Sequence, residues 1–502
     1  MFVNTFWSLV PPIVAIGLAL LTKETYSSLF IGIVVGALLA TDFSPIGALD
    51  TIINDGLTAA IADNAGIFLF LVILGVMVAL VNATGGSAAF GRWAASHIHS
   101  KAGALLATFA LGVLIFIDDY FNCLTVGSVM TPVTDSQKIS RVKLAYLIDA
   151  TAAPICMIAP ISSWAAAVSG VAAKLDTGVS GIQLFIEAIP YNFYSLLTIV
   201  FVITMVVLGV DYGPMAAAEL KAAQTGDLGA LSEEQEEGSS RANMWDMLIP
   251  IILLIIFCVI GLIYVGGFWD PETNAGDFIA AFGDTDAFVG LPWGALIALV
   301  LSIIYLCARR VITFKGAMGC MTKGFNAMVP AILILTFAVS LKSMTGLLGA
   351  ADYVEGLMKQ ASEGLFMLLP AIIFVVACLL AFATGTSWGT FGILIPIVLP
   401  IFNAAPDLQI MGISACLAGA VCGDHCSPIS DTTIMASAGA NCNHIDHVST
   451  QIPYAVTVAA ICFVNYILAA FIRNVVISLA IGVVMVIGTL LVIRSVQSRK
   501  TA

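Results

Sequence analysis

Charged residues are scarce in this sequence, because Asp, Glu, Lys and Arg together make up only 10% of its 502 positions. Soluble domains carry about 25%. Hydrophobic residues make up 60% of the chain, and a soluble fold could not cover so much apolar surface with polar groups. The composition therefore excludes a soluble enzyme and predicts a protein whose surroundings are largely lipid.

Basic residues are rarer than acidic ones, at 19 against 31, which gives a net charge of −12. Such a chain lacks the positive surface that attracts nucleic acid, so no nucleic-acid partner is expected. The first basic residue, Lys23, follows the N-terminal apolar run 5–22. A signal peptide carries its positive charge ahead of the apolar core, so this run is predicted to be a retained membrane span.

The eleven cysteines lie mostly inside apolar stretches, where a thiol behaves as a small hydrophobic side chain. Cys422, His425 and Cys426 form the most suggestive metal-ligand cluster. Structural zinc needs four ligands at characteristic spacings, and no second pair follows. We therefore expect packing rather than metal binding by these thiols, and no cofactor besides the coupling ions.

Long uncharged apolar runs are abundant, at 65–82, 194–210, 247–268, 291–308 and 474–493. Because about 20 apolar residues cross the roughly 30 Å hydrocarbon core of a bilayer, these runs predict an all-α polytopic membrane protein. Acidic residues are grouped between the runs, in 42–63, 211–237 and 270–286. Charge runs are usually solvated, so we expect loops there.

An internal repeat is visible at one offset. Residues 159–163 (Ala-Pro-Ile-Ser-Ser) resemble residues 427–431 (Ser-Pro-Ile-Ser-Asp), 268 positions later. The same offset places 118–120 (Asp-Asp-Tyr) on 386–388 (Thr-Ser-Trp). Because the offset holds without a gap from residue 103 to residue 169, it predicts two copies of one structural unit.

The repeat divides the chain into a first copy (1–211), a cytoplasmic linker (212–244), a second copy (245–473) and an extra C-terminal helix with its tail (474–502). Each copy is predicted to hold five transmembrane helices, at 5–22, 26–41, 65–82, 143–173 and 190–210, and at 245–265, 291–308, 326–344, 408–437 and 453–472. Each also holds an apolar segment that is too long and too broken for one span, 103–132 and 366–400, which we interpret as a re-entrant hairpin. Five crossings are an odd number, so the second copy is inverted, as is typical of secondary transporters.

The basic residues support this topology. If the N-terminus lies outside and the C-terminus inside, fifteen of the nineteen basic residues lie on the cytoplasmic side. The positive-inside rule predicts such a bias. The same topology places His444, Asp446 and His447 in an inside loop, where we expect them to be solvated.

Polar clusters interrupt the apolar helices beside Gly and Pro. Irregular backbone at membrane depth is tolerated only where it is buried in protein or lines a cavity, and its freed carbonyls can coordinate sodium together with hydroxyls and carboxylates. No thiolate or imidazole cage indicates a transition metal. The candidate ion- or substrate-binding residues are Asp118, Asp119, Asn122, Thr125, Ser162, Ser163, Thr386, Ser387, Thr390, Asp424, His425, Ser427, Ser430, Asp431, Thr432 and Thr433.

The intramembrane aspartates are the leading candidates, because ionisable groups inside a membrane are costly and usually functional. A poorly solvated carboxylate binds either a proton or a sodium ion, and that competition is a minimal antiport mechanism. We assign sodium binding to Asp118, Asp119 and Asp431 as a hypothesis, and Asp149 is a weaker candidate.

Structural alternatives stay open for several of these residues. One of Asp118 and Asp119 could cap the second half of the hairpin, since Asp is a favoured N-cap. Asp424 could orient His425, and His425 could be either a pH sensor or a structural histidine. The aromatic residues beside the clusters either pack or form the wall of an organic substrate site; they are Tyr120, Trp164 and Trp388.

The stretch from Gly423 to Thr433 (Gly-Asp-His-Cys-Ser-Pro-Ile-Ser-Asp-Thr-Thr) resembles the signature of NhaC-type sodium/proton antiporters. Residues 117–120 and 160–162 are similar to that family as well. The resemblance implies the ion-transporter-superfamily fold, a scaffold domain, a moving domain with both hairpins, elevator-like transport and a homodimer. Members of the family exchange sodium for protons, couple ions to organic acids such as malate and lactate, or carry amino acids.

Two functions therefore remain open: a sodium/proton antiporter of the cytoplasmic membrane, or a sodium- or proton-coupled carrier of an amino acid or carboxylate. A carboxylate cargo would need positive charge, and no intramembrane Arg or Lys lies near the clusters in sequence, although half-helix N-termini could supply it. A channel is less favoured. A membrane enzyme is also less favoured, because no nucleophile–base arrangement is visible.

Overall fold

The computed structural model describes residues 2–22, 24–98, 100–116, 119–159, 162, 164–165, 168, 181–231, 241–350, 352–353, 367–401 and 406–501. The regular structure of these residues is helical, and their only β-type pairing is an isolated bridge between Ala230 and Cys442. A helix satisfies its own backbone hydrogen bonds, which a lipid environment requires. The predicted all-α class is confirmed.

Five described helices are long and apolar enough to cross a membrane. They are α5 (Ala65–Thr84), α15 (Trp245–Val265), α17 (Ala287–Ala308), α24 (His444–Ile472) and α25 (Val475–Thr501). Two further pairs qualify as bent spans: α12 (Gly181–Ala188) and η3 (Ile189–Tyr191) with α13 (Phe193–Leu208), and α22 (Pro406–Cys426) with α23 (Asp431–Gly439). This is the helix content of a polytopic membrane protein.

Both predicted hairpin segments form two helices with a break between them. The first is α7 (Lys101–Leu114) followed by α8 (Asp119–Ser136), and the second is α20 (Leu369–Thr384) followed by α21 (Ser387–Ile401). The starting residues of α7 and α20 differ by 268 positions (369 − 101), and so do those of α8 and α21 (387 − 119). Within each segment the two helices contact each other. Their return to one membrane side, and the inversion of the second copy, stay predictions.

Two predicted long helices are broken at proline. Within the described part of the expected helix 143–173, α9 (Arg141–Thr151) ends before the short α10 (Ala153–Cys156). The expected helix 408–437 is divided into α22 and α23, which meet at 50° around Pro428. Proline lacks a backbone N–H and clashes with the preceding turn, so it ends a helix.

The acidic segment 42–63 is helical, although we expected a loop. It holds α3 (Pro45–Thr51), the π-helical turn η2 (Ile52–Thr58) and α4 (Ala59–Asp63). The start is well specified, since Pro45 occupies the first helical position and the Ser44 hydroxyl accepts from the Gly47 amide. Both are favoured helix-start features.

The segment His444–His447 is helical and not a loop, and the two histidines are not solvated, whereas Asp446 is exposed as expected. α24 begins at His444, nine residues before the predicted start, and the Asn443 side chain caps it by accepting from the Asp446 amide. His444 and His447 are both buried. Their side chains face the protein because they occupy the inner face of this first turn.

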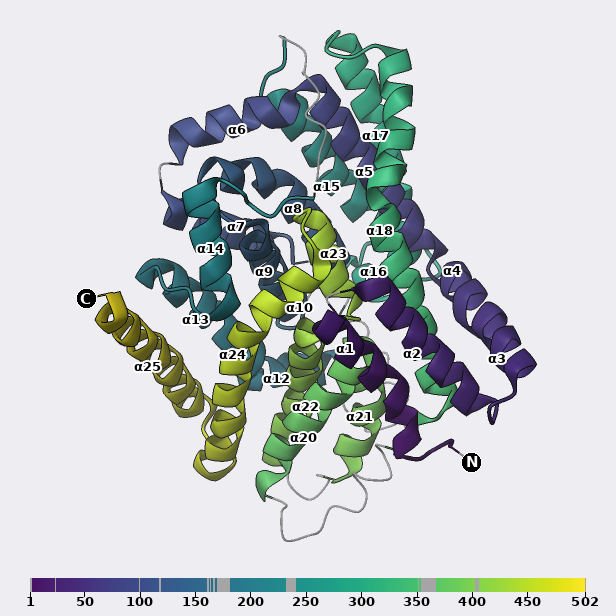
Figure 1. Cartoon of the computed structure of the whole chain (residues 1–502), viewed down its shortest axis with the longest axis vertical. Helices are drawn as coiled ribbons and strands as arrows, with labels where there is room; N and C mark the ends of the chain where they lie inside the picture. Colours follow the sequence, from purple (N-terminus) through teal and green to yellow (C-terminus); the bar gives the residue numbers. More distant parts are fainter. Residues whose placement is uncertain are drawn as a thin grey trace.

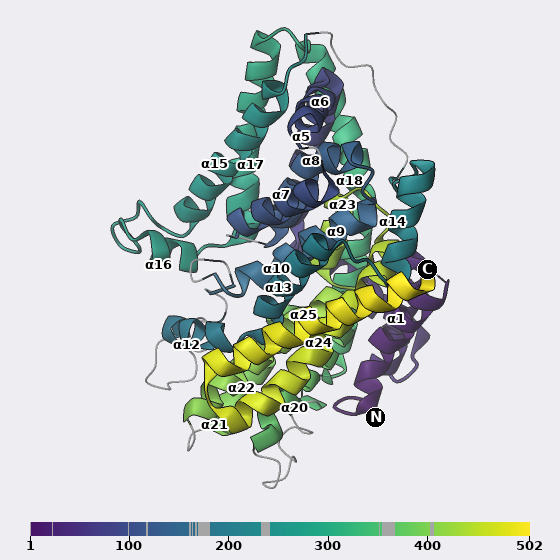
Figure 2. The same cartoon turned by 90° about the vertical axis from the view of Figure 1, so that its left-hand side faces the viewer.

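The helices form two groups that meet at α23 (Figure 1). One group contains α5, α15, α17 and α18 (Phe314–Leu347), and the other contains α20, α22 and α24. α23 contacts α8, α9 and α18. α25 lies along α24 and α13 at the periphery (Figure 2). The remaining helices are η1 (Phe6–Leu9), α1 (Val10–Thr22), α2 (Thr25–Ala40), α6 (Gly86–His97), α14 (Gly213–Thr225) and α16 (Phe278–Gly283).

Candidate functional site

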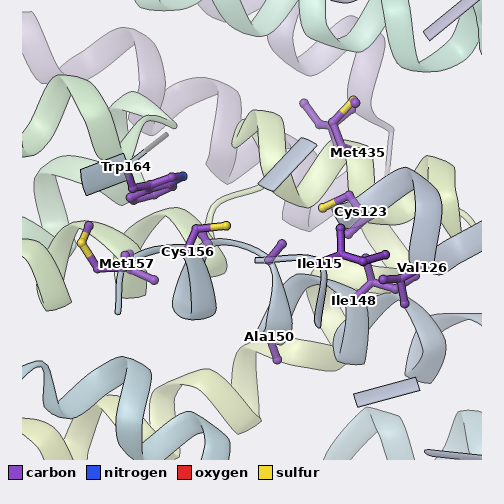
Figure 3. Close-up of a cluster of buried hydrophobic side chains, with 14 of the residues drawn as sticks. Ile115, Cys123, Val126, Ile148, Ala150, Cys156, Met157, Trp164 and Met435 are labelled. Carbon is purple, nitrogen blue, oxygen red and sulfur yellow. The ribbon is translucent and has the colours of Figure 1, made fainter. Parts of the chain in front are cut away.

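Helices α8 and α23 approach each other backbone to backbone. A Cβ atom added to Gly127 of α8 would lie 2.3 Å from the Gly439 carbonyl oxygen, and one added to Gly439 would lie 2.3 Å from the Cys123 carbonyl oxygen. Small residues allow such close packing of membrane helices. Around this contact, Cys123, Val126, Ile148 and Ile115 point toward one another from α8, α9 and the end of α7 (Figure 3). The contact between α8 and α23 therefore lies beside a cluster of apolar side chains.

Asp431 lies in the first turn of α23 and links this helix to the first hairpin. The Tyr120 hydroxyl of α8 donates to Oδ2 of Asp431 at 2.6 Å, and the Thr432 amide donates to Oδ1 at 2.9 Å. The Ser430 hydroxyl caps the helix by accepting from the Thr433 amide. A helix N-terminus favours negative charge, so the position suits a carboxylate.

Asp424 lies near the end of α22, on the other side of the break. The Thr432 hydroxyl donates to its Oδ2 at 3.0 Å, and the Ser430 and Thr432 hydroxyl oxygens lie 2.9 Å apart. Asp424 is 2% exposed, and its Oδ1 has no hydrogen-bond partner among the described residues. Thr432 thus binds both carboxylates, Asp431 with its amide and Asp424 with its hydroxyl.

The donor atoms at this break are oxygens, the type that hard cations prefer. Among the described residues, no group of three or more His, Cys, Asp or Glu side chains is placed to hold a metal ion. Carboxylate and hydroxyl oxygens of Asp424, Asp431 and Thr432 gather at the break instead. The same break frees backbone carbonyls, which are typical sodium ligands in transporters.

One positively charged side chain that is distant in the sequence influences Asp431 in the structure. Lys342 of α18 exerts an electrostatic effect on Asp431, since α18 packs against α23. Among the described residues, neither Asp424 nor Asp431 forms a salt bridge with a Lys or Arg side chain. Their negative charge is therefore moderated from a distance rather than neutralised by a contact.

Asn122 and Ser162 bind backbone carbonyls. The Asn122 side-chain amide donates to the carbonyl oxygens of Gly112 (2.7 Å), Ile115 (2.8 Å) and Thr151 (3.1 Å). It therefore ties the break between α7 and α8 to the end of α9. The Ser162 hydroxyl donates to the Cys156 carbonyl at 2.7 Å, which holds the chain after α10.

The hydroxyls of the second hairpin also bind backbone. Ser387 donates to the Ala420 carbonyl of α22 at 3.2 Å, and Thr390 donates to the Thr386 carbonyl at 2.8 Å. Ser427 donates to the Phe382 carbonyl of α20 at 2.8 Å. The Ser387 contact fixes α21 to α22, the Ser427 contact fixes α20 to the end of α22, and these three hydroxyls donate to backbone carbonyls and not to the two carboxylates.

Some predicted site residues lie outside the described part of the chain, and others are characterised mainly by their burial or packing. Asp118 and Ser163 lie outside the described residues. Asp119 opens α8 and is 2% exposed, and Thr125 is buried one and a half turns later with no hydrogen-bond partner for its hydroxyl among the residues described. The two tryptophans do meet, because the rings of Trp164 and Trp388 pack edge to face with centroids 6.1 Å apart.

A second buried cluster lies around Asp149, which the sequence analysis treats as a weaker candidate for ion binding. Gln451 of α24 donates from Nε2 to Asp149 Oδ2 at 2.9 Å and to the His425 carbonyl at 2.6 Å. Nδ1 of His425 lies 2.8 Å from the Tyr194 hydroxyl. Asp149 and Gln451 are 302 positions apart, so no local sequence pattern could connect them.

A cavity of about 650 Å³ opens between α5, α8, α15, α18 and α23. Most of its wall is apolar, and its polar side chains are Asn82, Ser128, Thr131, Asp135, Ser136, Arg141, Asn326 and Asn441. Arg141 is buried and forms a two-pronged pair with Asp135, at 2.8 Å from Nε to Oδ1 and 2.9 Å from Nη2 to Oδ2. A buried arginine therefore does lie beside the polar helices.

Comparisons with known proteins show similarity to antiporters. The sequence model of the Na⁺/H⁺ antiporter family matches residues 155–471. An uncharacterised protein of Haemophilus influenzae is 37% identical over 94% of this chain and 92% of its own length. The arginine/ornithine antiporter ArcD of Halobacterium salinarum is 26% identical over 47% of this chain and 44% of its own. The malate-2H⁺/Na⁺-lactate antiporter of Bacillus subtilis is 26% identical over 39% and 42%.

Proposed function

Because the chain belongs to the Na⁺/H⁺ antiporter family, a family of multi-pass membrane transporters, we propose that it exchanges sodium for protons across the cytoplasmic membrane. The carrying observation is the pair of carboxylates, Asp424 and Asp431, that share Thr432 at the break between α22 and α23. We propose that Asp119, which opens α8, and Asp118, which precedes it in the sequence, complete the ion site. Its cargo is a sodium ion or protons.

Competition between the two ions follows from the surroundings of the carboxylates. Keeping both Asp424 and Asp431 negatively charged in an apolar environment is costly. A sodium ion lowers that cost by bridging oxygens, and protons lower it by neutralising the carboxylates. Because both ions use the same oxygens, binding of one displaces the other, which is the condition for exchange.

The ion site is proposed to move in an elevator-like manner. In support, Tyr120 ties the first hairpin to α23, and Ser387 ties the second hairpin to α22. Elements connected in this way would travel together past α5, α15, α17 and α18. We propose a homodimer in the lipid bilayer, with the N-terminus outside and the C-terminus inside.

A coupled carrier of an amino acid or carboxylate is the second candidate, and the cavity favours it. Its volume of about 650 Å³ lies in the range of about 300–1,000 Å³ for small-molecule sites. Arg141 and Asp135 offer one charge of each sign at its wall, which would suit an amino acid. Two relatives are named as antiporters of arginine/ornithine and of malate/lactate.

Proteoliposomes that contain only this protein and a pH-sensitive dye test the proposal. Sodium added outside should drive proton movement without any organic solute, and Asp431→Asn and Asp424→Asn should each abolish it. Asp227→Asn is the matched control, since Asp227 is an exposed linker residue. A signal that needs an added amino acid or carboxylate would replace antiport with coupled carriage. Full exchange by Asp431→Asn would contradict the proposed ion site.

A further inference from the structure

Asp149 faces two histidines in the interior of the protein. Nε2 of His425 lies 4.0 Å from Asp149 Oδ2, and Nε2 of His447 lies 3.9 Å from it. Asp149 is 1% exposed and His447 is fully buried. Apart from Gln451, which donates to Oδ2, the described residues give no hydrogen-bond partner to Asp149 Oδ1 or to either Nε2 atom. The Thr433 side chain also acts on Asp149 and the Gln451 side chain on His447, so these three buried atoms have polar neighbours but no close hydrogen bond among the described residues.

Ser437 decides which histidine nitrogens carry hydrogen. Its hydroxyl oxygen lies 2.9 Å from Nδ1 of His444, 2.8 Å from Nδ1 of His447 and 2.9 Å from the Thr433 carbonyl oxygen. The hydroxyl has one hydrogen, so it donates to only one of these atoms. Nε2 of His444 lies 2.8 Å from the Pro428 carbonyl oxygen, which only accepts, so this nitrogen carries a hydrogen.

A neutral His444 therefore has a lone pair at Nδ1, and the Ser437 hydroxyl donates to it. Nδ1 of His447 must then donate to Ser437, which leaves a lone pair on Nε2 of a neutral His447. This lone pair faces the Asp149 carboxylate at 3.9 Å. Two buried acceptors that face each other without a hydrogen between them are unfavourable. One additional proton removes the conflict.

The other hydrogen assignments also need one additional proton, but on His444. If Ser437 donates to His447 or to Thr433 instead, both nitrogens of His444 must donate and its ring is positively charged. His444 faces a hydroxyl and a carbonyl, whereas His447 faces a carboxylate. Opposite charges attract most strongly at short range in a low-dielectric interior, so the proton is best placed beside Asp149.

We propose that Asp149 and His447 together bind one proton, carried by one or the other side chain, at a site separate from the Asp424–Asp431 pair. The role of this proton in ion exchange rests on the proposed function. Gln451 supplies a physical connection, because it binds Asp149 and the His425 carbonyl together, and His425 follows Asp424 in α22. Loss of the proton changes the charge beside Gln451. Through the hydrogen bond from Gln451 to the His425 carbonyl, we expect this change to alter the position of the end of α22.

Other titratable groups lie on α9 and on the helices near Asp149 and His447. α9 itself contributes Tyr146, and the helices around it bring several acids, histidines and phenols. They are Asp119 and Tyr120 of α8, Tyr194 of α13, Asp424, His425 and Cys426 of α22, Asp431 of α23 and His444 of α24. Variants at Asp149 and His447 are therefore needed to assign a titration to this pair.

Infrared difference spectra of purified protein between acid and alkaline pH test the site without sodium. The wild type should show protonation bands that Asp149→Asn and His447→Gln both lose. Asp149→Asn preserves the shape of the side chain, and the amide N–H takes the place of the proton, so this variant should also keep the thermal stability of the wild type. Thr450→Val is the matched control in α24, because the Thr450 hydroxyl binds only its own helix. An Asp149→Asn spectrum identical to that of the wild type overturns the inference.

Sodium-triggered proton release in unbuffered detergent solution separates this inference from the proposed function. Asp149→Asn should release fewer protons than the wild type while sodium still raises its unfolding temperature. Loss of both effects in Asp149→Asn would merge the two sites and overturn a separate proton site. If sodium affects neither quantity in the wild type, antiport fails, and the infrared spectra still decide whether the pair holds a proton.

Discussion

Tyr120 donates its phenolic hydrogen to Asp431 at 2.6 Å, across 311 positions of the chain. The bond joins the start of α8, in the first hairpin, to the start of α23, in the second half of the protein. Each residue comes directly after a helix break, so the bond also fixes the two breaks relative to each other. An ion bound at Asp431 would therefore be sensed by both halves of the chain.

Removal of this hydroxyl should weaken ion binding without disturbing the fold. Tyr120→Phe keeps the ring and its contact with Phe288, but it leaves Asp431 with one hydrogen-bond donor fewer. A hydrogen bond to a charged group contributes about 1.5–3 kcal/mol, which corresponds to a roughly tenfold to hundredfold change in affinity. The sodium concentration for half-maximal exchange in proteoliposomes should change by up to this scale, while the helix content stays that of the wild type. An unchanged sodium dependence would show that Asp431 does not bind the ion through this network.

The contact between α8 and α23 should not tolerate a methyl group. Gly127→Ala would place its Cβ 2.3 Å from the Gly439 carbonyl oxygen, so the helices would have to separate. Overpacking in a tight interior costs about 1–3 kcal/mol, and we expect a lower unfolding temperature together with slower exchange. Gly319→Ala in α18 is the control, since nothing lies within 4 Å of its added Cβ. Equal stability of the two variants would contradict the close packing.

Substitutions of Arg141 and Asp135 should have coupled effects on the stability of the fold. Arg141→Met removes the two-pronged ion pair with Asp135 and also the Nη1 donor to the Ala440 carbonyl. Loss of one partner from a fully buried pair costs about 3–5 kcal/mol, and the cost here should be smaller because the Asp135 side chain is 30% exposed; the variant should still unfold at a lower temperature. The double variant Arg141→Met/Asp135→Met should recover part of that loss, as a double-mutant cycle measures. Strict additivity of the two single changes would mean that the pair does not stabilise the fold.

Acid should loosen the linker near Asp227. The hydrogen bond from Lys221 lowers the pKa of Asp227 below its usual value of 3.8. A depressed folded-state pKa means that the stabilisation is present above the unfolded-state pKa and is lost as the pH falls through the folded-state pKa. Limited proteolysis of the linker should therefore accelerate as the pH is lowered below about 4. Asp227→Asn should show the faster cleavage at neutral pH, and an identical rate in both proteins would rule out a role for this pair.

The sequence predicted the helices whose signal is local. The run 245–265 became α15 with both predicted ends, and the offset of 268 residues reappears in the starting positions of α7 and α20. An uncharged apolar run of about 20 residues has only one stable form in lipid, a helix that satisfies its own backbone. Hydropathy alone therefore specified these elements.

The candidate site was predicted in part. Asp424, Ser430, Asp431 and Thr432 do gather at a broken helix, because the break lies within one short motif around Pro428. Asn122, by contrast, binds three carbonyls. A polar residue at membrane depth satisfies buried backbone as readily as it binds an ion, and the residue type does not distinguish these uses.

What the sequence determined by itself is the kind of molecule and the location of its breaks, since both depend on the solvation of consecutive residues. Only the tertiary structure decided which polar groups share a site. Asp149, Gln451 and His447 come from α9 and α24, and Asp149 and Gln451 are 302 positions apart. His447 became buried because the first turn of α24 faces inward. Hydrogen bonds act over about 3 Å, so the pairing of such groups is fixed by how helices pack and not by their order along the chain.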